Sequence, residues 1–138
     1  MKYYIVIDTN ILVSAMLARH PDSATVVLTL RMLAGELTPL YSDEIMQEYR
    51  DVLFRPKFKF PPDKIAVILS AIKKFGICVQ PSASGMILPD MKDLPFYEVV
   101  SDTQDKHSRL VTGNLKHFPE EPFIVTARQM LDILDSDN

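Results

Sequence analysis

Acidic side chains at three separate places in the sequence could bind a metal ion. Asp8 directly follows the apolar run Tyr3–Ile7, and Glu48 and Asp93 belong to two later segments with helical patterns. Hard divalent cations such as Mg2+ prefer carboxylate and water ligands, whereas zinc favours cysteine and histidine. Without a cysteine or histidine cluster, the chain favours Mg2+. Such an ion can activate water and neutralise charge on a phosphodiester under attack.

Asp8 is expected at the end of a buried strand. An unbroken, β-favouring apolar run such as Tyr3–Ile7 is typical of a strand covered on both faces in a parallel sheet. Ligands of open α/β sheets bind beyond the carboxyl ends of the strands, which places Asp8 in a functional position. Asp8 or Thr9 could equally cap a helix over the following segment Ile11–Leu17. Position alone supports function and capping equally.

Glu48 borders the apolar face of a helix that Ser42 or Asp43 caps and that runs to about Phe54. At 100° per residue, Glu48 lies about 60° from Ile45 and about 40° from Val52. A carboxylate so close to the core needs a cation or hydrogen bonds. Metal binding is therefore favoured over a partly buried salt bridge.

Asp93 precedes a helix expected over residues 94–104. Pro95 in the first turn supports this helix start. Capping is the ordinary explanation for one Asp, but a carboxylate here can also be held rigidly toward a strand end. Both roles are compatible.

Asn114 follows a strand expected over residues 110–112. Gly113 permits a sharp turn between them. The Asn114 amide could orient water or phosphate, or it could serve only the turn, and we weigh the two equally. His117 is interpreted as a surface turn residue.

Helical and strand patterns alternate along the rest of the chain. Further helices are expected over 22–34, 63–75 and 127–134, and strands at 40–41, 77–79 and 123–125, with loops over 55–62 and 80–92. Strands alternating with helices imply an α/β fold with a parallel sheet. No repeat or linker divides the chain, so one domain over residues 1–138 is expected.

Bulk properties exclude several classes of protein. No apolar run approaches the roughly 20 residues that cross a bilayer, and no secretory signal pattern follows Met1. We therefore expect a cytoplasmic protein that does not contact a membrane. Cys78 is the one cysteine, which excludes an intrachain disulfide and predicts a small buried residue.

The net charge of -3 is not typical of a phosphate-binding domain. Basic residues nevertheless gather in one region, at Arg50, Arg55, Lys57, Lys59 and Lys64, and could form a rim beside an acidic pocket. Residues 55–60 alternate cationic and aromatic side chains, which can meet phosphates and stack on unpaired bases. Packing of Phe58 and Phe60 into the core is the slightly favoured alternative.

Four segments in order resemble the PIN-domain nucleases, particularly the small bacterial and archaeal proteins described as toxins of toxin-antitoxin pairs. They are IVIDTNILVSA (5–15), SDEIMQEY (42–49), DMKDLPFY (90–97) and LVTGN (110–114). The resemblance spans nearly the whole chain. It implies a three-layer PIN-like fold with a central, mainly parallel sheet flanked by helices.

By this resemblance, Asp8, Glu48 and Asp93 are catalytic acids that coordinate Mg2+ or Mn2+. We assign Thr9, Asn10, Thr112 and Asn114 to substrate binding. The implied activity is that of an endoribonuclease that hydrolyses RNA to leave a 5′-phosphate. The resemblance also implies a homodimer and a small antitoxin protein as partner.

The chain departs from the family pattern at one place. Many relatives carry a fourth acid around Asn114 or His117, and its absence here predicts a lower metal affinity or rate. The main alternative function is therefore a catalytically weak or inactive PIN-like module that binds RNA or an antitoxin. Loss of metal binding with retained partner binding would identify it. A phosphatase with Asp8 as nucleophile would need a second Asp where the chain has Asn10.

Overall fold

The computed structural model describes residues 2–136, across which the chain forms six α-helices and five β-strands. In chain order these are β1 (Tyr4–Ile7), α1 (Thr9–Leu17), α2 (Ala24–Leu33), β2 (Thr38–Tyr41), α3 (Asp43–Leu53), α4 (Pro62–Phe75), β3 (Ile77–Cys78), α5 (Leu94–Asp102), β4 (Arg109–Val111), β5 (Ile124–Val125) and α6 (Ala127–Ser136). Short 3-10 turns lie at Met91–Asp93, Gln104–Lys106 and Leu115–His117. The alternation of strands and helices expected from the sequence is confirmed.

The five strands form one parallel sheet in the order β3-β2-β1-β4-β5. The apolar strand β1 is central, and its residues Ile5, Val6 and Ile7 are buried. Ile7 is in register with Val111 of β4, so Asp8 and Thr112 leave the sheet side by side. The two edge strands, β3 and β5, are each two residues long.

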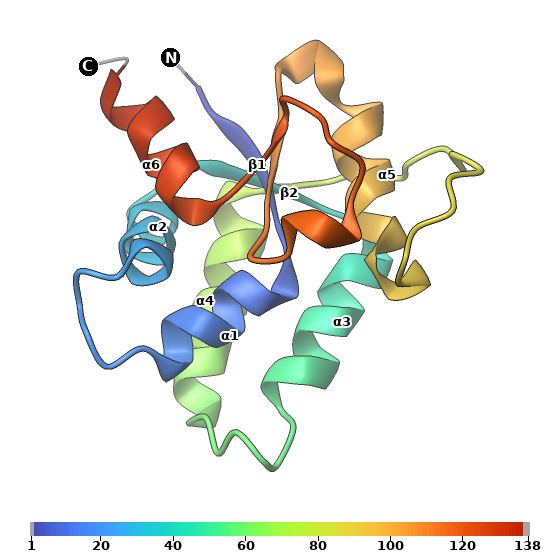
Figure 1. The fold of residues 1–138 in the computed structure, drawn as a ribbon. Coiled ribbons are helices and arrows are strands. Elements are labelled where there is room, and N and C mark those ends of the chain that lie inside the picture. Colours follow the sequence, from blue (N-terminus) through green and yellow to red (C-terminus); the bar gives the residue numbers. More distant parts are fainter. Residues whose placement is uncertain (1, 137–138) are drawn as a thin grey trace.

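Helices cover both faces of the sheet, which gives the three layers expected for a PIN-like fold. Helix α5 packs against β1, β2 and β4, whereas α2 and α6 contact each other on the opposite side (Figure 1). Helices α1, α3 and α4 extend beyond the carboxyl ends of the strands, toward the bottom of Figure 1. Because α3 contacts both α1 and α5, these three helices surround the carboxyl end of β1.

Helix α5 ends at Asp102, two residues earlier than expected. The Thr103 hydroxyl donates to the carbonyl oxygen of Val99 at 2.7 Å and lies 2.7 Å from the Ser108 hydroxyl. Side-chain hydroxyls that bond to helix carbonyls in this way compete with continuation of the helix. His107 then adopts a left-handed conformation with φ 54°, which turns the chain into β4.

The expectation that Cys78 is buried is wrong. Cys78 is exposed, because β3 is an edge strand whose two side chains both face solvent. Phe58 and Phe60 are half-buried and stack on each other at 5.0 Å between ring centroids, and Phe60 also packs against the core. Within residues 2–136, none of the helices combines the length and apolar character that crossing a membrane requires.

Candidate active site

The three predicted acids come together beyond the carboxyl end of the central strand. Asp8 follows β1, Glu48 lies on α3, and Asp93 lies at the start of α5. Their charges act on one another, since Asp93 and Glu48 both raise the pKa of Asp8, and Asp93 raises that of Glu48. The packing of α3 and α5 around β1 therefore gathers negative charge at one point.

Asp8 is buried, with 4% of its surface exposed, and is held by hydrogen bonds from two side chains. Its Oδ2 atom accepts from Thr112 Oγ1 at 2.7 Å and from Asn10 Nδ2 at 3.3 Å. The carboxylate makes no side-chain cap bond to α1, although Asp8 stands at the N-cap. Burial raises the pKa of Asp8 from 3.8 to about 6, and the hydrogen bond from Thr112 opposes this rise.

Glu48 is half-buried, as its place on the helix predicted, and its Oε2 atom accepts a hydrogen bond from Thr9 Oγ1. Burial is the main cause that raises its pKa. Arg55 lowers this pKa through its charge, but Glu48 forms no salt bridge with any residue within 2–136. The salt-bridge alternative is therefore not what the structure contains.

Asp93 faces a histidine rather than capping its helix. It stands at the N-cap of α5 without a side-chain cap bond, and its Oδ2 atom lies 3.1 Å from His117 Nδ1. The neighbouring Asp90 instead caps the short turn, accepting from the Lys92 backbone at 3.0 Å. Burial raises the pKa of Asp93, and the hydrogen bond from His117 lowers it.

The residues assigned to substrate binding form a hydrogen-bonded frame around the acids. Thr9 and Thr112 donate to Glu48 and Asp8, as described above. Asn10 links Asp8 to the turn after β4, because its Nδ2 atom donates to Asp8 and its Oδ1 atom accepts from the Gly113 backbone at 3.1 Å. The Asn114 backbone donates to Thr112 Oγ1 at 3.0 Å, while its exposed side chain has no hydrogen bond among the described residues.

Sequence reasoning missed two contacts that support the site. The buried Tyr49 donates its hydroxyl to the carbonyl oxygen of Ile7, directly before Asp8, and its ring packs against Phe96. A tyrosine within the apolar stripe of α3 is the signal, because a buried hydroxyl requires a partner. The contact between His117 and Asp93 had no comparable signal, since it joins two turns 24 positions apart.

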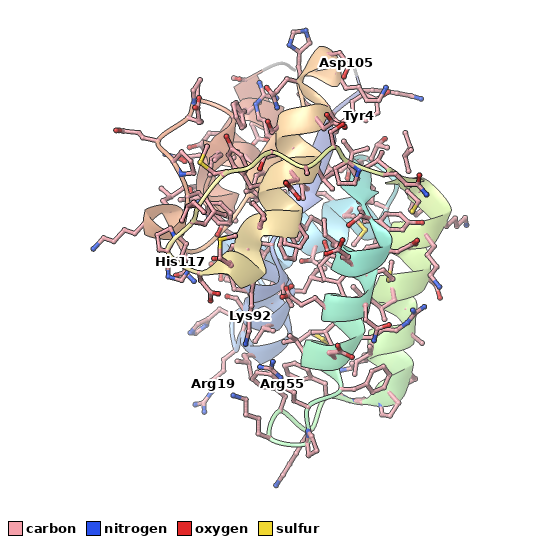
Figure 2. All side chains as sticks on the ribbon, turned by 90° about the vertical axis from the view of Figure 1, so that its right-hand side faces the viewer. Tyr4, Arg19, Arg55, Lys92, Asp105 and His117 are labelled. Atoms are coloured by element: carbon pink, nitrogen blue, oxygen red, sulfur yellow. The ribbon has the colours of Figure 1, made fainter. Side chains whose placement is uncertain are left out.

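Basic side chains lie at the end of the molecule beyond the acids. In Figure 2, His117 and Lys92 lie near the middle of the view and Arg19 and Arg55 lie below them, whereas Asp105 lies at the opposite end. Lys92, Arg19 and Arg55 are exposed and form no salt bridge among the described residues. Arg55, whose charge acts on Glu48, and Lys92, which directly precedes Asp93, are available to meet an anionic ligand beside the acids.

The site contains three carboxyl groups, and no Lys or Arg among the described residues forms a salt bridge with any of them. As the side chains stand, no group of three or more His, Cys, Asp or Glu residues within 2–136 is arranged to hold a metal ion. The donor types nevertheless fit a hard divalent cation, because all three acids are desolvated. A bound cation would favour the ionised form of each carboxyl group.

A model of the PIN domain matches residues 4–116 of the chain. The matched range includes Asp8, Glu48 and Asp93, and it ends one residue before His117. Comparison with curated proteins and with solved structures gave no match.

Proposed function

The chain belongs to the PIN domain family, whose members are generally nucleases, and we propose that it is an endoribonuclease dependent on Mg2+ or Mn2+. The observation that carries this proposal is the burial of Asp8 beside two further acids, with no cationic side chain within residues 2–136 paired to it. An ionised carboxylate so placed is costly unless a cation or hydrogen bonds compensate it. A divalent cation would supply that compensation and the chemistry as well.

Asp8, Glu48 and Asp93 are the residues that would hold the ion. When bound, Mg2+ or Mn2+ supplies an activated water and neutralises charge on the phosphodiester. Thr112 and Thr9 each occupy one oxygen of a carboxylate and so restrict how Asp8 and Glu48 can turn. Neither a histidine base nor a covalent nucleophile is needed for this hydrolysis.

The exposed basic side chains would bind the RNA backbone in the proposed activity. A nucleic-acid backbone is bound mainly through phosphate contacts with Lys and Arg. Arg55 is close enough to Glu48 to lower its pKa, so this cation can meet a phosphate next to the acids. Basic residues near the acids can therefore attract phosphate, although the net charge of the whole chain is -3.

Cleavage of a labelled single-stranded RNA by the purified protein tests the proposal. The reaction is run with Mg2+, Mn2+ or EDTA, and single-stranded DNA of the same sequence is run in parallel. Asp8→Asn, purified in the same way, excludes a contaminating nuclease. We expect RNA cleavage that needs the metal and is absent in Asp8→Asn; metal-independent cleavage, or equal cleavage by the variant, would refute the proposal.

A catalytically weak or inactive RNA-binding or antitoxin-binding module is the second candidate. One observation favours it: the turn after β4 carries Asn114 and His117, which add no fourth acid, and His117 contacts Asp93 instead. Absence of cleavage by folded wild-type protein in both metals, together with RNA binding, would support this function.

We extend the proposal to a toxin of a toxin-antitoxin pair that forms a homodimer and binds a small antitoxin protein. The family resemblance is its support. Induced expression in a bacterial host should arrest growth for the wild type but not for Asp8→Asn. Light scattering of the purified protein should give twice the mass of 15.7 kDa.

A further inference from the structure

His117 provides the third of three similar contacts in the site. Each acid accepts a hydrogen bond from a side chain elsewhere in the chain: Asp8 from Thr112, Glu48 from Thr9, and Asp93 from His117. An ionised carboxylate only accepts hydrogen bonds, so Nδ1 of His117 is the donor in the last pair. Histidine therefore performs for Asp93 what the two threonines perform for the other acids.

Asp93 depends on this contact more than the other acids depend on theirs. Asp8 directly continues the central strand, and Glu48 lies in the middle of an eleven-residue helix. Asp93 instead ends a three-residue turn, and the residues from 79 to 90 before it form neither helix nor strand. Its carboxylate has no cap bond to α5, so His117 is its one hydrogen-bond partner among the described residues.

The pair is placed at the boundary between the site and solvent. The His117 side chain is 42% exposed, whereas that of Asp93 is 16% exposed. A single side-chain pair in which one partner is largely open to solvent contributes only modestly to overall stability. A contact that fixes one carboxylate therefore affects the site more than the fold.

We propose that His117 is a positioning residue, which holds the Asp93 carboxylate toward Asp8 and Glu48 so that the three acids act as one metal-binding group. This role rests on the proposed function, because it concerns the same site. Outer partners that orient a metal ligand commonly change metal affinity by roughly 10- to 100-fold when they are removed. His117 occupies one oxygen of Asp93 and leaves the other free for the ion.

Titration calorimetry with Mn2+ tests the role without relying on cleavage. The variants are His117→Ala, His117→Asn, whose amide N–H takes the place of Nδ1, and His117→Gln, whose amide takes the place of Nε2. His20→Ala, an exposed histidine in the loop after α1, is the matched control. We expect His117→Ala to weaken Mn2+ binding by roughly 10-fold or more. His117→Gln should weaken it to the same extent, whereas His117→Asn and His20→Ala should bind Mn2+ as the wild type does.

Cleavage kinetics supply a second readout. The Mn2+ concentration for half-maximal cleavage should rise in His117→Ala, while the rate at saturating Mn2+ recovers. Equal Mn2+ affinity in His117→Ala and wild type, or equal restoration by Asn and Gln, would overturn the role of His117 and leave the nuclease proposal standing. A wild type that binds no Mn2+ would overturn both. If His117→Ala fails to fold by circular dichroism, the comparison of Asn with Gln decides.

Discussion

Thr112 donates its hydroxyl to Asp8 at 2.7 Å, although 104 positions separate the two residues. Both are buried, and each directly follows one of the paired central strands β1 and β4. The parallel register of these strands thus places an acid and its donor side by side. The same hydroxyl also holds the turn after β4 in place, because Thr112 Oγ1 accepts from the Asn114 backbone at 3.0 Å.

Thr112→Val should weaken both the site and the fold. Valine has nearly the shape of threonine but removes the shortest side-chain hydrogen bond to the buried Asp8 and leaves the Asn114 N–H without its partner, which costs about 1–3 kcal/mol of unfolding free energy. Cleavage should fall by roughly 10- to 100-fold, as for loss of an outer partner of a metal ligand. Urea denaturation and single-turnover cleavage measure the two effects. Thr112→Ser, which keeps the hydroxyl, is the control, and a similar loss in both variants would contradict the role of the hydroxyl.

Asp8→Asn should abolish cleavage and stabilise the metal-free protein at neutral pH. Burial raises the pKa of Asp8 from 3.8 to about 6, so the ionised form costs about 3 kcal/mol in the folded state. Asp8 binds its proton more tightly in the folded protein than in the unfolded chain. The free energy of unfolding of the wild type should therefore fall as the pH rises from about 4 to about 6. Urea denaturation in EDTA at pH 4 and pH 7 measures this.

In Asp8→Asn, this part of the pH dependence should disappear. The stability advantage of the variant should be present at pH 7 and absent at pH 4. A variant that is less stable than wild type at pH 7 would show that the Asp8 carboxylate is compensated in the fold, contrary to the shift in its pKa.

Glu48→Gln should reduce cleavage more than the roughly 10- to 100-fold expected for an outer partner, because Glu48 is assigned to direct metal contact. The amide keeps the shape of the side chain and removes the charge of a half-buried carboxyl group, whose pKa is raised by burial. Stability should therefore be unchanged or higher. Glu44→Gln, on the exposed side of the same helix, is the matched control for the loss of one acid. Equal cleavage by both variants would remove Glu48 from the site.

Tyr49→Phe should lower stability with little change in the metal dependence of cleavage. The substitution removes the hydrogen bond to the Ile7 carbonyl oxygen and keeps the ring against Phe96. Loss of a partner from a buried acceptor costs about 1–3 kcal/mol. Thermal and urea unfolding measure this loss, with Tyr4→Phe, at a partly exposed position, as the control. Equal stability of Tyr49→Phe and wild type would show that Ile7 needs no such donor.

The positions of Asp8 and Glu48 could be predicted because local patterns determine them. An apolar run that ends at an acid marks the end of a strand, and helical phase places Glu48 beside the buried face. The donors of the site could not be predicted in the same way. Which hydroxyl meets which acid depends on strand order and on helix packing, and these bring together residues such as Thr9 and Glu48 that lie far apart in the chain.

Asp93 and Cys78 show where local rules fail. A helix start suggests capping for Asp93. Asp90 instead caps the turn over Met91–Asp93, and the Asp93 carboxylate contacts His117. Cys78, as a single cysteine, is expected to be a small buried residue, but the sheet ends at β3 and leaves both residues of this strand exposed. Whether a strand is central or at the edge is decided by topology and not by its own residues.

The shortness of β3 and β5 bears on how the protein behaves at high concentration. An unpaired strand edge offers backbone donors and acceptors to another molecule and is a common starting point for aggregation. Here each edge strand has only two residues, and both ends of the sheet therefore present few such groups. The apolar strand β1 has no free edge, because it is paired with β2 on one side and with β4 on the other. Short edge strands and the central place of β1 thus both limit the addition of a strand from another molecule.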